Sequence, residues 1–227
     1  MRRPGVVQGC GAVWWRAGVR HAGCRSVEPL LGGVLPFDVP VAAVRRRVRQ
    51  RPAQNPCVTD NRYNEGLGLT YDLPVRGQPL RLTGPLNAHF TVSTRSRDSQ
   101  LTVRLEDVAP DGSAIQLTAG WLSLSMRHLD RGKSIVRNGM IVQPWHPYTK
   151  ASQQAMPKDE PVSVDVEIFP ASWSIQPGHR LRLAVQTGDF PHLFPPFPQL
   201  KDSLGGDVQL WHDPEHPSWI TLPTQPS

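Results

Sequence analysis

The sequence predicts an all-β fold, a sandwich or barrel of about eight to ten short strands, and three observations support this. Proline accounts for 24 of the 227 residues, about twice its usual share of roughly 5%. Proline interrupts helices because it lacks an N–H donor and clashes with the preceding turn. From Leu69 onward, short segments alternate apolar and polar residues, which is the period of a strand with one buried face. Pro, Gly, Asp or Asn residues separate these segments, and we identify no convincing helix.

The first predicted hairpin covers residues 101–126. Its first half alternates Leu and Val with polar residues, as one buried face requires. A turn at residues 109–112 (Ala-Pro-Asp-Gly) follows, in which Pro presets φ and Gly accepts a positive φ. The second half is a returning strand, in which Gly120 predicts a bulge or bend.

A second pair of strands is predicted at residues 162–168 and 180–186. Both alternate Val, Leu or Ile with polar residues, and the turn Gln176-Pro177-Gly178 precedes the second strand. A segment of about 160 residues is long enough to bury a core without covalent cross-links. Shorter candidate strands complete the prediction at residues 87–94, 135–142, 207–211 and 219–222.

The positive charge is concentrated at the start of the chain. Residues 1–56 carry ten Arg, one Asp and one Glu, a net charge of +8, whereas the rest carries 15 basic and 17 acidic residues, a net charge of −2. Residues 45–51 include five Arg, which leaves a phosphate-binding arm open as one hypothesis. The near-neutral remainder gives no charge argument for nucleic acid, so we do not expect nucleic acid as a partner.

Residues 1–56 also lack periodicity. We expect a poorly ordered extension there, followed by one domain over residues 57–227. A signal peptide is not predicted, because Gln8 interrupts the apolar stretch and Trp14-Trp15 replace small residues at its end. An Arg-rich transit peptide fits the composition but not the low Ser content. No apolar run approaches the roughly 20 residues of a membrane-spanning helix, so we expect no membrane association and favour the cytoplasm.

Neither a metal nor a cofactor is expected. The three cysteines, Cys10, Cys24 and Cys57, form no C-x-x-C motif and cannot make a closed disulfide set. Residues 212–216 (His-Asp-Pro-Glu-His) are the best local cluster of metal ligands. Its proline opposes the helix that would bring both histidines onto one face, so a polar loop is the simpler interpretation.

The motifs of nucleophilic and phosphate chemistry are incomplete. The G-x-S-x-G turn, which exposes a catalytic serine, is approached only at residues 132–136 (Gly-Lys-Ser-Ile-Val), which lack the second Gly. The same Gly-Lys-Ser would end a phosphate-binding loop only if Arg127 were Gly. The G-x-G-x-x-G motif is also absent. We therefore predict no catalytic residue in this chain.

A set of short motifs, in a fixed order, resembles the C-terminal non-catalytic domain of Xaa-Pro dipeptidyl-peptidases and cocaine-esterase-like hydrolases. Alpha-amino-acid ester hydrolases carry a similar domain. The resemblance covers residues 60–223. The motifs are Leu82-Thr83-Gly84-Pro85, residues 101–112, 117–120, 175–183 and 188–191, and the final His212-Asp213-Pro214, Pro217-Ser218 and Leu222-Pro223.

The resemblance implies a jelly-roll β-sandwich, which is galactose-binding-like, and a partner. In that family an α/β-hydrolase domain precedes the sandwich and supplies the catalytic Ser, Asp and His, while the sandwich helps to wall the substrate cleft. None of that triad can be carried over to this chain. We therefore expect a detached accessory domain that is inactive alone, either a truncated gene product or a subunit that needs a separate catalytic chain.

Two aromatic stretches are candidates for a domain interface or a ligand-facing surface. The loop at residues 145–148 (Trp-His-Pro-Tyr) either faces a partner or caps the core. Residues 190–197, with three Phe and three Pro, either form an exposed apolar patch or fold back as a core plug. An exposed patch would favour self-association. The candidate residues are Trp145, His146, Tyr148, Phe190, His192, Phe194 and Phe197.

A free-standing binding module is the alternative, for a carbohydrate or a protein partner. Aromatic side chains stack on sugars, and Trp145, Trp173 and Trp219 are predicted in loops. Trp121 and Trp211 lie in strand patterns, where packing is the simpler role.

Overall fold

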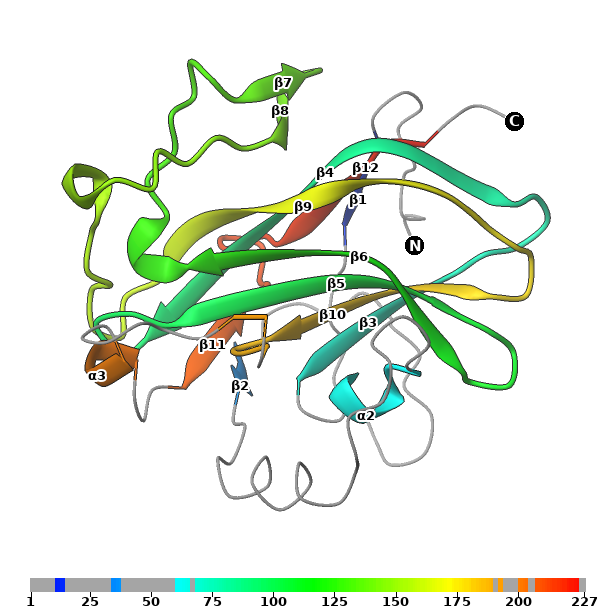
Figure 1. Cartoon of the computed structure of the whole chain (residues 1–227), viewed down its shortest axis with the longest axis horizontal. Helices are drawn as coiled ribbons and strands as arrows, with labels where there is room; N and C mark the ends of the chain where they lie inside the picture. Colours follow the sequence, from blue (N-terminus) through cyan, green and yellow to red (C-terminus); the bar gives the residue numbers. More distant parts are fainter. Residues whose placement is uncertain are drawn as a thin grey trace.

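The computed structural model describes residues 60–65, 68–189, 192–193, 200–203 and 207–224, together with two strands nearer the start of the chain, β1 (Gly11–Trp14) and β2 (Val34–Phe37). The described residues form antiparallel sheets with very little helix (Figure 1), which confirms the predicted all-β class. The further strands are β3 (Leu69–Pro74), β4 (Leu80–Thr94), β5 (Gln100–Val108), β6 (Ala114–Ser123), β7 (Ile135–Arg137), β8 (Met140–Gln143), β9 (Val162–Ile175), β10 (Arg180–Gln186), β11 (Val208–Trp211) and β12 (Trp219–Leu222).

The helical elements are single turns. They comprise α2 (Arg62–Glu65), α3 (Leu200–Ser203) and the 3₁₀ turns η2 (Leu124–Met126) and η3 (Lys150–Ser152). None of the described helices is long and apolar enough to cross a membrane.

The first sheet, sheet A, is organised around the long strand β4. Strand β9 pairs with one edge of β4, and β12 and β11 pair in succession along the other edge. Strand β1 extends the sheet beyond β12, and β2 extends it beyond β11. The sequence pattern predicted no element in residues 1–56, so these two strands are additions, and the rest of that segment lies outside the described residues. The proposed boundary at residue 57 stays a prediction.

The second sheet, sheet B, has the order β3-β10-β5-β6. The predicted hairpin of residues 101–126 is its β5–β6 pair. The bulge in this pair lies opposite Leu105 and Glu106 and not at Gly120, where it was predicted. Gly120 instead marks the place where sheet B meets β9, since a Cβ there would lie 2.0 Å from the carbonyl oxygen of Glu167.

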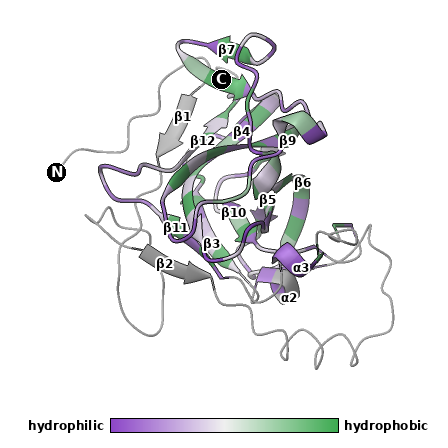
Figure 2. Ribbon diagram, turned by 90° about the vertical axis from the view of Figure 1, so that its left-hand side faces the viewer, coloured by the Kyte–Doolittle hydropathy of each residue, from purple (hydrophilic) through white to green (hydrophobic). Residues whose placement is uncertain are grey.

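The core lies between the two sheets. Strands of both sheets alternate hydrophobic and hydrophilic residues, as the ribbon in Figure 2 shows. One face of each strand is therefore available for burial. The largest fully buried side chains come from both sheets: Phe90, Leu82, Leu86, Ile168, Ile175 and Ile220 from sheet A, and Leu101, Leu105, Leu122, Leu181 and Leu183 from sheet B, together with Leu124 of η2. This places the polar residues of sheet A, such as His89 and Asp165, on its outer face.

Strands β7 and β8 form a separate small hairpin outside the two sheets (Figure 1), and β8 lies against β4 of sheet A. Its turn is Asn138-Gly139, and both residues have positive φ, 51° and 78°. This is the requirement of a two-residue type I′ turn, for which Asn-Gly is the preferred sequence. We call residues 127–149, which contain this hairpin and the loop that follows it, the β7–β8 arm.

Candidate interface site

His146 fixes the β7–β8 arm to the outer face of sheet A. Its side chain is only 5% exposed. Ring atom Nδ1 lies 3.0 Å from the carbonyl oxygen of His128, and Nε2 lies 2.9 Å from the carbonyl oxygen of Asp165 in β9. Both partners are acceptors, and a ring nitrogen can bond to a carbonyl only through an N–H, so a ring with one N–H donates to one of them at a time. The imidazole lies between the start of the arm and the sheet, within hydrogen-bond distance of both, and acts as a structural anchor.

Beneath the arm, Asp165 is the centre of a polar cluster. Its carboxylate accepts hydrogen bonds from Nδ1 of His89 at 3.0 Å and from the side-chain amide of Asn87 at 2.8 Å. Burial opposes ionisation of Asp165, but the hydrogen bond and charge of His89, the amide of Asn87 and the charge of His146 lower its pKa below the ordinary value. His89 in turn stacks on Trp219, with ring centroids 3.8 Å apart. The contacts of Asp165 and His89 therefore belong to a packed cluster, in which the side-chain oxygen of Asn87 is buried without a hydrogen-bond partner.

Further polar contacts hold the hairpin and the loop. The Asn87 amide donates to the carbonyl of Ile141 at 3.0 Å, and Gln143 donates to Glu167 at 2.8 Å. Within the arm, the N–H of Asp130 donates to the carbonyl of Trp145 at 2.9 Å. The arm is therefore joined to β4 and β9 at several points, which restricts its movement relative to sheet A.

This scaffold leaves two aromatic side chains exposed, at positions 145 and 148. Trp145 is 50% exposed and Tyr148 is 54% exposed. The ammonium group of Lys133 lies 5.9 Å from the centroid of the Trp145 ring, which is within cation–π range. Tyr148 has a φ of 51°, an uncommon conformation for a bulky residue that the surrounding structure must stabilise. Partial burial and the charge of Glu167 raise the pKa of Tyr148.

The other predicted stretch belongs to sheet B. His192 is exposed, and its Nδ1 lies 3.5 Å from Asp189. Asp189 also accepts a hydrogen bond of 2.9 Å from the Trp121 indole and forms an ion pair with the buried guanidinium of Arg104. His192 thus contacts a residue that is held by sheet B, whereas the loop at residues 145–148 is anchored to sheet A. Phe190, Phe194 and Phe197 lie outside the described residues.

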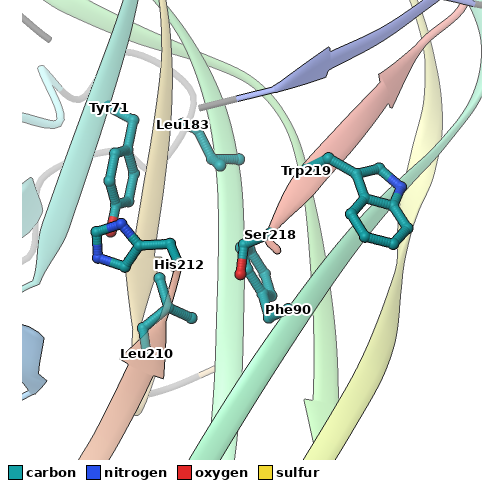
Figure 3. Close-up of a pocket in the computed structure, with 7 residues that line it drawn as sticks. All are labelled: Tyr71, Phe90, Leu183, Leu210, His212, Ser218 and Trp219. Atoms are coloured by element: carbon teal, nitrogen blue, oxygen red, sulfur yellow. The ribbon is translucent and has the colours of Figure 1, made fainter. Parts of the chain in front are cut away.

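A small pocket opens between the sheets (Figure 3). It is lined by Tyr71 and Leu183 of sheet B, Phe90, Leu210 and Trp219 of sheet A, and His212 and Ser218. The Tyr71 hydroxyl and Nε2 of His212 are buried and have no hydrogen-bond partner in the structure. Burial favours the neutral form of each ring. It therefore raises the pKa of Tyr71 and lowers the pKa of His212. The lining is otherwise mostly apolar.

The outer face of sheet B contains a buried ionic group. Arg182 forms two hydrogen bonds with Asp72, of 2.6 and 2.8 Å, and an ion pair with Glu65 of α2. The neighbouring Glu106 is fully buried, and neither of its carboxylate oxygens has a hydrogen-bond partner in the structure. Burial, together with the adjacent Glu65, raises the pKa of Glu106 to about 8.

Several exposed apolar residues were not predicted from the sequence. Residues 135–142 were predicted as one candidate strand, but they form the β7–β8 hairpin, in which Ile135 and Val136 are exposed. The Asn-Gly turn is the signal that could have identified this hairpin. Trp173 was predicted in a loop, but it lies in the second half of β9, where it is 44% exposed. Trp219 was taken as loop-like, but it is the first residue of β12, which confirms the candidate strand at residues 219–222. The indole of Trp173 donates to Asp107 at 3.4 Å.

The residues 212–216 form a loop and not a helix. Asp213 accepts hydrogen bonds from the backbone N–H groups of Glu215 and His216, both at 2.9 Å, and its carboxylate contacts the His216 ring at 3.0 Å. These contacts lower the pKa of Asp213 although desolvation opposes the shift. In the part of the chain that the structure describes, no group of three or more His, Cys, Asp or Glu residues is arranged to hold a metal ion.

Two antiparallel sheets around one core, with a hairpin arm held against sheet A, define an all-β domain. The chain belongs to the family described as the X-Pro dipeptidyl-peptidase C-terminal non-catalytic domain, whose family model matches residues 29–221. The match begins inside the segment predicted as an extension, and it includes β2 but not β1.

Curated relatives support the same family. A proposed serine esterase of Mycobacterium tuberculosis is 28% identical over 167 residues, which cover 74% of this chain and 25% of that protein. The cocaine esterase of a Rhodococcus species is 26% identical over 163 residues, which cover 68% of this chain and 25% of that protein. The chain therefore spans about a quarter of the length of the curated relatives it matches.

Solved structures share the fold. A CocE/NonD family hydrolase from Staphylococcus aureus superposes with a TM-score of 0.65 at 18% identity, over 97% of this chain and 37% of that chain. An alpha-amino acid ester hydrolase superposes with a TM-score of 0.57 at 23% identity, over 74% of this chain and 28% of that chain. At these identities the likeness concerns the fold alone.

Proposed function

We propose that this chain is the C-terminal accessory domain of a serine hydrolase of the dipeptidyl-peptidase or acyl-esterase class, and that it acts by docking on an α/β-hydrolase catalytic domain and shaping its substrate cleft. The observation that carries the proposal is the family match over residues 29–221, combined with relatives about four times as long. In such a pairing, the catalytic domain supplies the nucleophile and this domain supplies a wall of the cleft.

The described residues contain four imidazole–carboxylate pairs, and the two most buried of them support a non-catalytic role. His89 and Asp165 lie under the arm and are stacked on Trp219, and Nδ1 of His179 lies 2.7 Å from Asp107. A catalytic pair needs a nucleophile within hydrogen-bond reach of the second ring nitrogen. The stacking contact of His89 and the arm anchors around Asp165 are instead contacts of a folded scaffold.

The test is an activity measurement on the purified chain, alone and with a catalytic partner. The substrates are an Xaa-Pro-nitroanilide and short acyl esters. The partner is the part of the Rhodococcus cocaine esterase that this chain does not match, produced without its matched segment. We expect no hydrolysis by this chain alone, and more activity or a higher thermal midpoint of the partner when this chain is added. Robust turnover by this chain alone would refute the proposal.

The second candidate function is a free-standing binding module for carbohydrate or a protein. The exposed Trp145 and Tyr148 favour it, because aromatic faces on a rigid loop suit sugar stacking. Glycan-array binding that is lost in Trp145→Ala would support this alternative over the accessory-domain function.

A further inference from the structure

We infer that the β7–β8 arm is the surface through which this domain binds its hydrolase, and that the receiving face of the hydrolase is an apolar patch with an acidic border. This inference rests on the proposed function, because it names the docking surface of the accessory domain and the chemistry of its partner.

The arm combines exposed apolar residues with a fixed backbone. Ile135, Val136, Trp145 and Tyr148 are between 40% and 54% exposed. Trp and Tyr are the residue types that contribute most to protein–protein binding, and a preorganised loop loses little conformational entropy when it binds. The anchoring of the loop by His146 meets that condition, since its ring joins two backbone carbonyls.

The backbone of Tyr148 supports the same conclusion. Its φ of 51° costs free energy in the isolated domain. The capping turn that follows, in which Thr149 and Ser152 exchange hydrogen bonds, helps to hold this conformation. In this conformation the Tyr148 side chain is 54% exposed and is available to a partner.

The charge of the arm differs from that of the rest of the domain. Residues 127–149 and the adjoining Lys150 contain five basic residues and one acidic residue, whereas the remainder of residues 57–227 contains ten basic and sixteen acidic residues. Arg131, Lys133, Arg137 and Lys150 are exposed. Lys133 lies 5.9 Å from the centroid of the Trp145 ring. Basic side chains on the same arm as exposed aromatic ones are complementary to an apolar face with carboxylates at its rim, and such complementarity fixes orientation and speeds association.

The size of the relatives identifies the occupant. About three quarters of each curated relative lies outside the segment that this chain matches. The polypeptide available to cover the arm is therefore the remaining part of such a hydrolase. When both parts belong to one chain, the linkage gives the remaining part a high effective concentration near the arm.

The experiment measures binding between this full chain and a probe. The probe is the Mycobacterium tuberculosis relative without its matched 167 residues, immobilised at low salt. The arm variants are Trp145→Ala and the double variant Lys133→Glu/Arg137→Glu. The matched controls are Trp173→Ala, which removes a tryptophan of similar exposure from β9, and Arg76→Glu/Arg81→Glu, which reverses two exposed charges outside the arm.

We expect Trp145→Ala to weaken binding by at least about tenfold, as for a central aromatic contact. The charge-reversal variant should slow association and reduce its dependence on salt, while both controls bind within about twofold of the unchanged chain. Hydrogen exchange of the complex should show slower exchange in residues 130–149. Thermal unfolding of each variant separates a binding effect from a folding effect.

Other outcomes overturn the inference in distinguishable ways. Equal losses in the arm and control variants, or binding unaffected by the arm variants, would reject the arm as the docking surface and leave the proposed function standing. No binding by the unchanged chain would count against both. Arm-dependent self-association, or arm-dependent retention on a single-stranded oligonucleotide in place of the hydrolase, would assign the surface to a different partner.

Discussion

Glu106 shows how a single buried carboxyl can set the pH dependence of this fold. Glu106 is fully buried on the outer face of sheet B. Its charged neighbours are Glu65 of α2, Arg104 on its own strand and Arg182 on β10. Asp72 on β3 lies opposite Arg182. The two guanidinium groups favour its ionised form, but burial and the Glu65 carboxylate outweigh them. A protonated Glu106 can donate a hydrogen bond to Glu65, and this would satisfy oxygens that otherwise lack partners.

The sign of the effect follows from the direction of the shift. The pKa of Glu106 rises from 4.5 to about 8 on folding. Between those values the unfolded chain has released a proton that the folded chain retains. The free energy of unfolding therefore falls as the pH rises from 4.5 to 8, by an amount on the order of a few kcal/mol, and is unaffected by this group above that range.

Replacing Glu106 with Gln should remove this dependence. The amide cannot ionise, and its NH₂ group can donate to Glu65. We expect Glu106→Gln to be more stable than the unchanged chain at pH 8, and the difference to shrink towards pH 5. Urea denaturation at both pH values checks this, with Glu160→Gln, which changes an exposed carboxylate, as the control. If the difference between the two proteins were the same at both pH values, Glu106 would not be the group responsible.

At the scale of strands, Gly120 controls how closely the edges of the two sheets approach. A Cβ at this position would lie 2.0 Å from the carbonyl oxygen of Glu167 and 2.9 Å from the Cα of Ile168. Thr118 reinforces the same junction, since its hydroxyl donates to the carbonyl of Phe169 at 2.7 Å. The obstructing atoms are backbone, so a side chain cannot simply rotate away.

Gly120→Ala should therefore separate β6 from β9. We expect a loss of at least about 2 kcal/mol in the free energy of unfolding, at the upper part of the range for overpacking. Gly188→Ala is the matched control, because a Cβ there meets nothing within 4 Å. Thermal midpoints of the two variants that agree within error would show that the junction is looser than the distances indicate.

The strands also show what could be predicted from the sequence. The alternating segments at residues 101–126 and 180–186 were correctly predicted as strands from the alternation of apolar and polar residues, and both segments lie in sheet B. The long strands β4 and β9 were predicted too short, since Gly84-Pro85 and Pro170 resemble turn residues. In the structure these residues fall at an irregularity of the β4–β9 pairing, and proline is tolerated at such a bulge or on an edge strand.

The candidate site was predicted only in part. The aromatic loop at residues 145–148 could be identified, because two rings and a proline in a short polar segment are unusual. The burial of His146 could not, because it depends on the Asp165 carbonyl, a group 19 residues away that the folded sheet brings within 2.9 Å. The interface role of the loop, and that of His192, remain predictions.

At the scale of the whole molecule, the sheet edges depend on residues near the start of the chain. Strand β2 pairs with β11 over four residues, and β1 pairs with β12 over four residues. Without them, β11 and β12 would present unpaired N–H and C=O groups along sheet A. Exposed edges of this kind favour association with other chains.

Truncation distinguishes the contributions of these two strands. Deleting residues 1–28 removes β1 and retains β2 and the whole family match, whereas deleting residues 1–56 removes both strands. We expect the shorter deletion to lower the thermal midpoint modestly, and the longer one to lower it further and to increase light scattering, because two edges of sheet A are then open.

Lys or Glu substitutions at Gln209, which lies on β11 and pairs with β2, should reduce the scattering of the longer deletion, since charges on an edge strand oppose pairing with another chain. If the protein lacking residues 1–56 is as stable and as monodisperse as the full chain, then β1 and β2 contribute nothing to sheet A, and the folded domain begins where the sequence pattern placed it, at residue 57.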